Sequence, residues 1–475
     1  MSAAHAAGAS EPTLDAFIAL AQRLRWDEVL PATRTMVKRE LLDWGGAAIA
    51  GRAAAGMPPW LQVLVDCGGR ADARVLGGPR VPAHTAALCN GYFGHVLELD
   101  DTHDEAVLHA GSAAIPAALA AAGLKGRVTG ADFCLAVLLG IELTCRLGVA
   151  TRLNLVEGGW IYTALFGHFG AALAAARVID HRPDVLRNAF GIVYCLASGN
   201  HQSTREGAPT KHVQPGFAAS NAILATLMAR GGLDGVKQPL TGEDGLSRVY
   251  LHGRFDAARA IQDLGTRYEI DRLSFKPYPT CRLTHPAISA ALELRAKLGH
   301  DIANIDRIEL VIGPQAHDVV GRDVPERRTP VTRVAAQFSV YWTVAVALAY
   351  GEVTPRQLAE DIPPSAHVRA WIDRISCRAD AAAGQRDVGG CTIRAHGSFG
   401  TLEVTHTNAK GHPDDPLSEE ELAAKFHANA RYAGMSATDA SALAGKIMRL
   451  DSMDDVVPFL DTLGTAAPYA ANRPV

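Results

Sequence analysis

The sequence predicts a mainly α-helical protein in which a smaller α+β domain is inserted between the two ends of a large all-helical domain. Two observations lead to this fold class. The first part of the 475-residue chain alternates Ala- and Leu-rich segments with Gly- or Pro-marked breaks. Because Ala favours helix and lets helix axes approach, this pattern indicates closely packed helices. Beyond about residue 271, apolar and β-branched residues alternate with polar ones, which is typical of strands.

The helical domain is expected over residues 1–270 and 405–475. Segments such as AAIPAALAAAGLKG and GHFGAALAAARVID are predicted helices, and a further one is expected to start near Pro215. Late in the chain, Ser418 and Glu421 have the spacing of a capping box ahead of apolar residues, which predicts another helix. We expect the last helices to pack back onto the first part of the chain.

The α+β domain is expected over residues 271–404. IDRIELVIG is a predicted strand, and CTIRAHGSFGTLEVTHTNA reads as two strands joined through a turn at HGSFG. Two predicted helices lie among these strands, HPAISAALELRAKLG and AAQFSVYWTVAVALAYGEV. The second is apolar enough to be mostly buried.

Composition excludes several classes of function. The net charge is only -4 and no run of Lys or Arg occurs, so neither nucleic acid nor a membrane surface is an expected partner. No apolar run reaches membrane-spanning length, and the N-terminal stretch lacks the features of a signal peptide. The eight cysteines are spread singly, as in a reducing compartment. The expected location is therefore the cytoplasm.

The densest polar stretch is HVLELDDTHDEAVLHAGS, residues 95–112. So many ionisable groups in an apolar neighbourhood are costly unless they are used or paired. One interpretation is a solvated loop in which Asp101 or Thr102 caps a helix. Another is a metal site formed by His103, Asp104 and His109, but their spacing matches no ligand motif. No metal is therefore predicted.

Two further segments carry candidate cations. In REGAPTKHVQPG, Lys211 is a candidate base or a donor to a developing oxyanion, although a lone loop Lys is more often surface decoration. In SFKPYPTCRLTHPAI, Lys276, Arg282 and His285 bracket a stiff Pro-Tyr-Pro segment. This segment can hold neighbouring side chains at low entropic cost, or serve as an interdomain hinge.

Taken in order, HVLELDDT, HAGS, TKHVQPGFAAS, FKPYPTCRLTHPAI and KGHPDDPLSEEEL resemble the MmgE/PrpD family over nearly the whole chain. That family includes 2-methylcitrate dehydratase, cis-aconitate decarboxylase and iminodisuccinate epimerase. The resemblance implies a homodimer, no metal or organic cofactor, and an α+β domain that acts as a lid, with the active site between it and the helical domain.

The resemblance also implies the site residues. The family's acidic loop, its following His and its two lysines fall here on Asp100, Asp101, Thr102, His109, Lys211 and Lys276. With neighbouring candidates added, the predicted catalytic residues are His109, Lys211, Tyr162 and Asp101. The predicted substrate-binding residues are Glu98, Asp100, Thr102, Lys276, Cys281, Arg282 and His285.

This sequence departs from the family pattern at four places. One is the spacing from Thr102 to His109, which is one residue longer than usual. Glu98 begins an E-L-D-D-T segment where the family often has D-F-D-D-T. Ile161 stands where many relatives have a pocket His, and the adjacent Tyr162 offers a phenol instead. Cys281 occupies a position that is His in some decarboxylating relatives. These departures weaken the transfer of any one relative's substrate.

The expected chemistry is proton abstraction alpha to a carboxylate of a small anionic polycarboxylate. Lys211, Lys276, Arg282 and His285 would offset the charge that develops, and His109 is the first choice of base or acid. The first hypothesis is a hydro-lyase similar to 2-methylcitrate dehydratase. The second is an isomerase, epimerase or decarboxylase on the same scaffold. From other classes, a metal-dependent hydrolase and a non-catalytic binding protein stay open.

Overall fold

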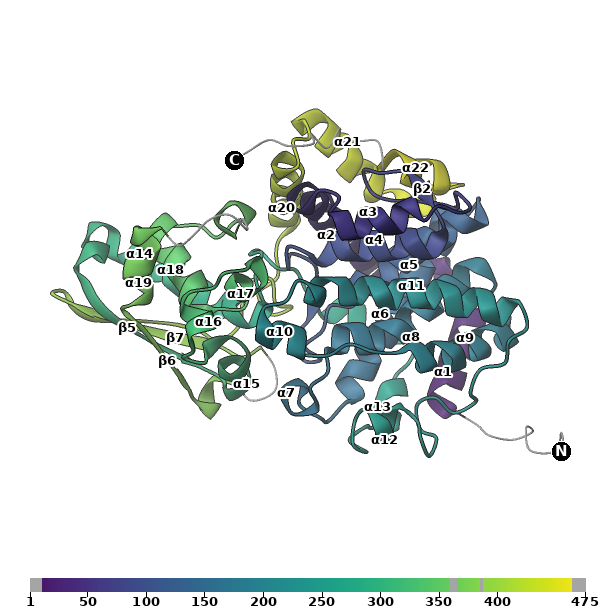
Figure 1. The fold of residues 1–475 in the computed structure, drawn as a ribbon, viewed down its shortest axis with the longest axis horizontal. Helices are drawn as coiled ribbons and strands as arrows, with labels where there is room; N and C mark the ends of the chain where they lie inside the picture. The colour runs from purple at the N-terminus through teal and green to yellow at the C-terminus, as the bar shows by residue number, and fades with distance from the viewer. Residues whose placement is uncertain (1–10, 359–364, 385–387, 464–475) are drawn as a thin grey trace.

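The protein has two lobes, a large helical body and a smaller lobe of helices and strands (Figure 1). This arrangement comes from a computed structural model that describes residues 11–358, 365–384 and 388–463. The predicted fold class, mainly α with a smaller α+β part, is confirmed. The predicted features of residues 1–10 and 464–475 lie outside the described residues.

The helices of the body are α1 (Pro12–Arg23), α2 (Pro31–Ala55), α3 (Pro59–Asp66), α4 (Ala83–His95), α5 (Gly111–Lys125), α6 (Gly130–Ala150), α7 (Leu155–Gly158), α8 (Tyr162–Ile179), α9 (Pro183–Leu196), α10 (Gln202–Glu206), α11 (Thr210–Arg230), α12 (Leu246–Val249), α13 (Ala257–Ile261), α20 (Glu419–Tyr432), α21 (Ala437–Ile447) and α22 (Val457–Leu463). Its short strands are β1 (Ala73–Arg74), β2 (Arg80–Val81), β3 (Thr102–His103) and β4 (Leu273–Ser274).

The smaller lobe contains α14 (His285–Leu298), β5 (Ile305–Ile312), α15 (Pro314–Ala316), α16 (Pro325–Arg328), α17 (Arg333–Gln337), α18 (Val340–Tyr350), α19 (Ala366–Ile372), β6 (Ile375–Ala379), β7 (Cys391–Gly397) and β8 (Gly400–His406).

Each lobe has its own hydrophobic core. The core of the body unites helices from the first half of the chain with α20, α21 and α22, so the last helices do pack back onto the first part. The predicted capping box is present: the Glu421 amide donates to Ser418 Oγ over 3.1 Å, and the Ser418 amide donates to Glu421 Oε2 over 2.7 Å. The second core lies within residues 281–404.

The domain boundaries at residues 271 and 404 stay predictions. The first falls within a short 3-10 helix, Glu269–Arg272, and the second falls within β8. Leu273 and Phe275 pack in the core of the body. The segment that follows residue 271 is therefore attached to the body before the chain enters the smaller lobe.

Two glycines bring α4 and α11 into close contact. A Cβ built on Gly91 would lie 2.7 Å from the Cα of Gly216, and a Cβ on Gly216 would lie 2.5 Å from the carbonyl oxygen of Leu88. His95 comes four residues after Gly91, and Lys211 comes five residues before Gly216. Each is about one turn from the crossing. The contact therefore places the end of α4 beside the start of α11.

The sequence contains two apolar helices of membrane-spanning length, contrary to our expectation. By length and composition alone, Gly130–Ala150 and Tyr162–Ile179 could each cross a bilayer. Their most apolar windows are, however, 100% and 94% buried inside the protein. They pack against each other through Gly140 and Gly170, as core helices of the body.

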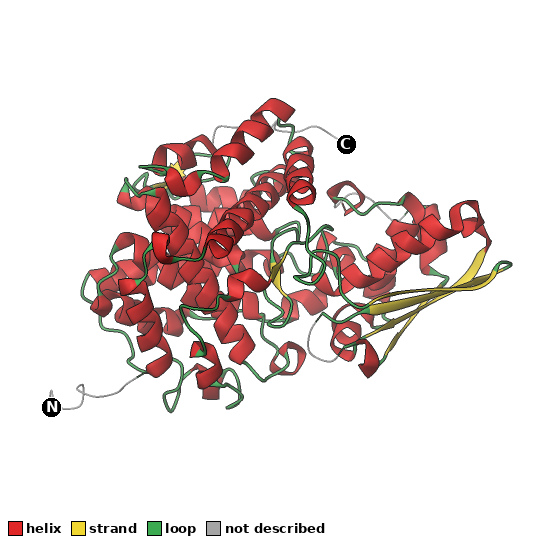
Figure 2. Cartoon of the chain, turned by 180° about the vertical axis from the view of Figure 1, so that it is seen from behind, coloured by secondary structure: helices red, strands yellow, loops and turns green. Residues whose placement is uncertain are grey.

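The sheet of the smaller lobe has the strand order β6-β5-β7-β8 and lies at the outer edge of the molecule (Figure 2). β5 pairs with β6 in parallel, and the other pairs are antiparallel. The three predicted strands are present, and β6 is an additional one. The long predicted helix is interrupted between α17 and α18, because Ser339 accepts a capping bond of 3.0 Å from the Trp342 amide.

Candidate active site

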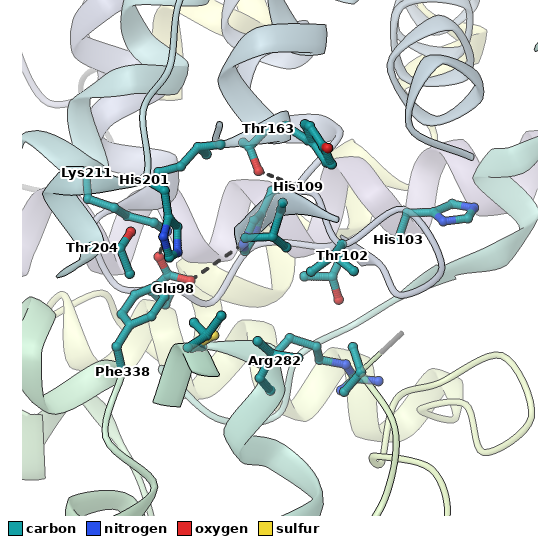
Figure 3. Close-up of a pocket in the computed structure, with 18 of the residues that line it drawn as sticks. Glu98, Thr102, His103, His109, Thr163, His201, Thr204, Lys211, Arg282 and Phe338 are labelled. Atoms are coloured by element: carbon teal, nitrogen blue, oxygen red, sulfur yellow. Dashed lines mark hydrogen bonds and ion pairs between the residues drawn. The ribbon is translucent and has the colours of Figure 1, made fainter. Parts of the chain in front are cut away.

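A cavity lies between the two lobes, with an empty volume of about 600 Å³ that includes the solvent at its opening. The predicted site residues that line it are Glu98, Thr102, His109, Tyr162, Lys211, Cys281 and Arg282. Those that do not line it are Asp100, Asp101, Lys276 and His285. In Figure 3, Lys211, His201 and Thr204 gather around Glu98, whereas His103 points away from this group.

Glu98 is the centre of a buried charged cluster. Lys211 donates to its Oε1, and Lys276 Nζ donates to its Oε2 over 3.2 Å. Although burial acts to raise the pKa of this carboxyl, Lys211 and Lys276 hold it well below its usual range. Glu98 therefore remains ionised at the wall of the cavity, between two ammonium groups from different parts of the chain.

His95 links this cluster to Asp100. Its Nδ1 lies 2.7 Å from Asp100 Oδ2, and its Nε2 lies 2.7 Å from Lys211 Nζ. A neutral imidazole fits both contacts, donating through Nδ1 and accepting through Nε2. The sequence did not identify His95, because a single His at the end of a helix is usually interpreted as a core residue. The Gly91 and Gly216 contact is what sets it against Lys211.

His109 is the imidazole of the cluster that opens on the cavity, with a side chain 12% exposed. Its Nε2 lies 3.6 Å from Glu98 Oε2, and its Nδ1 lies 3.3 Å from Asp100 Oδ2 without hydrogen-bond alignment. Burial lowers the pKa of His109 to about 4, against the pull of Asp100. The ring is therefore neutral at pH 7, and its backbone amide is anchored to Thr163 Oγ1 over 3.0 Å.

The loop that carries these groups is strained at two positions. Glu98 has a φ of 54° and Val107 has a φ of 51°, a left-handed conformation that costs a non-glycine residue on the order of 1–3 kcal/mol. The loop is tied down by the pairing of Thr102 with Ser274, in β3 and β4. This pairing sets the acidic segment beside the segment of Lys276.

Lys211 lies in the first turn of α11, since that helix begins at Thr210 and includes Pro215. The expected helix start near Pro215 was wrong, because Pro209 ahead of Thr210 already allows the chain to turn. Lys211 is 4% exposed, and its Nζ lies 5.0 Å from the centre of the Phe338 ring. It is a buried ammonium at the cavity wall rather than surface decoration.

Asp101 caps a helix, as the first interpretation of the loop expected, but the loop is buried rather than solvated: Asp100 and Asp101 are 0% exposed and Thr102 is 4% exposed. Asp101 accepts from the amides of Ala110 over 2.9 Å and Gly111 over 3.1 Å, at the start of α5. Burial, together with neighbouring Asp100, raises its pKa to about 7. The structure thus sets Asp101 behind the cavity, in a position that orients the loop.

Arg282 is paired with Asp104. Its Nη2 donates to Asp104 Oδ2 over 2.9 Å and its Nε donates to Oδ1 over 3.1 Å, while Nη1 donates to the Lys410 carbonyl over 2.8 Å. Thr102 also donates to Asp104, over 2.9 Å. This bidentate pair closes one side of the cavity and joins the acidic loop to the smaller lobe.

Three predicted site residues are engaged in local contacts. The Tyr162 hydroxyl donates to the Leu153 carbonyl over 2.7 Å. Burial raises the pKa of the Cys281 thiol to about 11, so it is protonated at neutral pH. His285 is fully buried, with Nε2 3.2 Å from the Thr280 carbonyl. Tyr162 and His285 thus have structural partners, and Cys281 is a buried, protonated thiol at the cavity wall.

The metal-site hypothesis named a trio that the structure separates. His103 Nε2 lies 3.1 Å from Glu269 Oε2, and Asp104 is held by Arg282. Within the described part of the chain, the side chains whose ligand atoms lie within 4.8 Å of one another are His95, Asp100 and His109. Two ammonium groups adjoin this trio, an electrostatic setting that disfavours a cation.

Comparison with known proteins gives consistent matches over the chain. A model described as the MmgE/PrpD N-terminal domain matches residues 15–258, and one described as the MmgE/PrpD C-terminal domain matches residues 278–445. Cis-aconitate decarboxylase from Aspergillus terreus is 26% identical over 468 residues, covering 93% of this chain and 94% of its own. Human cis-aconitate decarboxylase is 26% identical over 452 residues, covering 92% of each chain. The cis-aconitate decarboxylase-like protein oryM of Aspergillus oryzae is 29% identical over 372 residues, covering 73% of this chain and 75% of its own.

Proposed function

The chain belongs to the MmgE/PrpD family, and on that premise we propose that it is a carboxy-lyase that removes CO2 from a small unsaturated polycarboxylate of the cis-aconitate type. The relatives named above carry this activity in their names and match most of the chain. Dehydration, which ranked first on sequence alone, and proton-shifting isomerisation are the alternatives that an experiment must separate.

The observation that carries the proposal is the position of His109. It is a neutral imidazole at the cavity wall, flanked by the carboxylates of Glu98 and Asp100. An anionic substrate bound in the cavity adds negative charge beside the ring and favours its protonated form. His109 is then an acid that can deliver a proton to the substrate, while Asp100 stabilises the imidazolium.

The reaction needs one bond cleavage and one proton. The bond between the methylene carbon of the substrate and its carboxylate breaks, and the electron pair forms a new carbon–carbon double bond. The CH carbon of the original double bond receives the proton from His109, so the products are CO2 and a methylidene dicarboxylate with one carbon fewer than the substrate. Lys211 lines the cavity beside Glu98 and offsets the charge that develops. Such a preorganised donor contributes about a hundredfold to a thousandfold in rate.

The test is to incubate the purified protein with cis-aconitate, 2-methylcitrate and iminodisuccinate separately in deuterated water and to follow each by NMR. We expect CO2 release from cis-aconitate and one deuterium in the product. Loss of water from 2-methylcitrate without any CO2 release would replace the proposal with the hydro-lyase. Deuterium exchange into iminodisuccinate without a change in constitution would replace it with the epimerase.

The two remaining classes have their own readouts. Stoichiometric metal in the active protein, together with activity lost to a chelator, would favour a metal-dependent hydrolase. Binding of all three compounds without turnover of any would favour a non-catalytic binding protein.

We also propose that the protein is a homodimer. The support is a pair of exposed apolar side chains on one face of α11, Phe217 and Met228, each 44% exposed. They are eleven residues apart, which returns to the same side of a helix. Light scattering should give twice the chain mass for the protein and a lower value for Phe217→Lys; a monomeric mass for the unaltered chain would end the proposal.

A further inference from the structure

Part of the cavity wall is aliphatic. The lining residues of this kind are Val107, Leu155, Ile161, Leu283, Val319 and Val388, contributed by both lobes. Leu155 is partly buried and packs against both hydrophobic cores. Ile161 is only 9% exposed but belongs to neither core. Its side chain therefore faces the cavity and does not pack within a hydrophobic core.

In the part of the chain that the structure describes, the cationic side chains that line the cavity are already paired within the protein. Lys211 donates to Glu98 and approaches His95, and its remaining side faces the Phe338 ring. Arg282 uses Nε, Nη1 and Nη2 in bonds to Asp104 and to backbone carbonyls. His201 also lines the cavity, and burial lowers its pKa to about 4, so it is neutral at pH 7.

These two features limit how a substrate can gain affinity. Each additional carboxylate that enters a closed cavity must lose its hydration, and a cation already paired with a protein carboxylate compensates that loss poorly. An alkyl group against the aliphatic wall loses only unfavourable contact with water, and gains about fourfold in affinity for each methylene buried. Apolar surface on the substrate should therefore raise its affinity for this cavity more than a further charge would.

We propose that the natural substrate is an unsaturated polycarboxylate that carries an alkyl chain of several carbons, and that the aliphatic wall formed by these residues binds the chain. The proposal rests on the proposed function and names its substrate class. The alkyl chain takes no part in the bond changes described above. It positions the reacting carbons against His109 and Lys211.

The test compares cis-aconitate with its derivatives that carry a methyl, propyl or pentyl group on the methylene carbon. We expect kcat/KM for CO2 release to rise with chain length, reaching at least tenfold over cis-aconitate for the pentyl derivative. Equal or lower values for every alkylated compound would overturn the inference while leaving the proposed function intact.

The same four compounds are also tested for binding, by the rise in Tm that each produces. If none of them releases CO2, the proposed function fails, and the binding series still decides the inference. A larger rise for the longer chains supports the aliphatic wall as an alkyl site. No increase with chain length contradicts it.

Substitutions in the aliphatic wall test whether it causes the preference for longer alkyl chains. Ile161→Asn should lower the ratio of the pentyl to the unsubstituted kcat/KM by at least about fourfold, because one aliphatic contact becomes polar. Val319→Thr, which keeps the side-chain shape, is the second variant if Ile161→Asn does not fold. The matched control is Leu233→Asn, at a position that is 51% exposed and outside the cavity. An unchanged ratio in both wall variants would contradict the assignment.

Discussion

Two buried charge networks in this protein look alike but differ in how completely they are satisfied. In the first, Arg146 and Glu142 lie within α6, and Arg146 also donates to the carbonyls of Gln262 over 2.6 Å and Arg267 over 2.7 Å. Glu142 also accepts from the Glu269 amide over 2.7 Å. Arg146 is fully buried and does not line the cavity between the lobes.

The second network, around Glu98, is equally buried but incomplete. Glu98 lines the cavity, and two of the nearby imidazoles, His109 and His212, each have a ring nitrogen without a hydrogen-bond partner. A buried ion pair whose hydrogen bonds are all made joins parts of the fold. A buried pair beside a cavity, with hydrogen-bonding groups left over, can bind a ligand. The difference teaches that pairing alone does not mark a functional charge.

The largest effect should come from His109→Ala. Removing the proton donor should lower kcat by about a hundredfold to ten-thousandfold, with little change in Tm because the ring makes no aligned side-chain bond. Steady-state kinetics and thermal melts check both values. His84→Ala, in the first turn of α4 and outside the cavity, is the control. Turnover unchanged in His109→Ala would remove the basis of the comparison.

Arg146→Met should show the opposite pattern. Because Glu142 is left buried without its cation, the free energy of unfolding should fall by about 3–5 kcal/mol. The turnover of molecules that remain folded should stay within about twofold. Urea denaturation and kinetics at low temperature measure the two effects. A variant that loses activity but not stability would show that the two networks do not differ as described.

The pH dependence of stability is the next effect. Burial raises the pKa of both Asp101 and Glu142 to about 7, above the values of about 4 expected in the unfolded chain. The stabilisation of their protonated forms is present at low pH and is lost as pH rises. The contribution of these two carboxyls to the free energy of unfolding should therefore decline between about pH 4 and pH 7 and level off above. The buried imidazoles of His109 and His201, whose pKa values are lowered to about 4, contribute in the opposite direction over this range.

Asp101→Asn should gain stability relative to the unaltered protein as pH rises across this range, because one of the two titrating carboxyls is gone. The measurement is urea unfolding of both proteins at half-unit intervals across the same range. Parallel curves for the two proteins would contradict the role given to Asp101.

The smallest effect should come from Tyr162→Phe. Its hydroxyl bonds the Leu153 carbonyl, so its removal should cost about 1 kcal/mol of stability and leave kcat within about threefold. A loss of a hundredfold would return Tyr162 to the catalytic group in which the sequence placed it.

The sequence predicted the fold class because Ala-rich periodicity and strand alternation are local signals. It missed β6, since the short segment Ile375–Ala379 mixes Ser, Cys and Arg without clear alternation. It also placed the start of α11 at Pro215, although a proline is accommodated inside that helix.

For the site, sequence predicted which residues are polar but not which partner each one finds. Glu98, His109 and Lys211 do meet at the cavity, whereas Asp101 turns to a helix start and Arg282 to Asp104. These choices depend on tertiary contacts that no local pattern contains. His95 shows the same limit, since its role follows from a helix crossing rather than from its neighbours in sequence.

At that crossing, the distance between the axes of α4 and α11 should affect the rate of the reaction. An alanine at Gly216 would press its methyl into the backbone of α4, and the helices would have to separate. The 2.7 Å contact between His95 and Lys211, a turn away, would lengthen with them. Because a misplacement of about 1 Å can cost a hundredfold in rate, such a change would act as an enzymatic defect although it touches no reacting group. Gly216 therefore controls the distance between His95 and Lys211, although it contacts neither side chain's charged group.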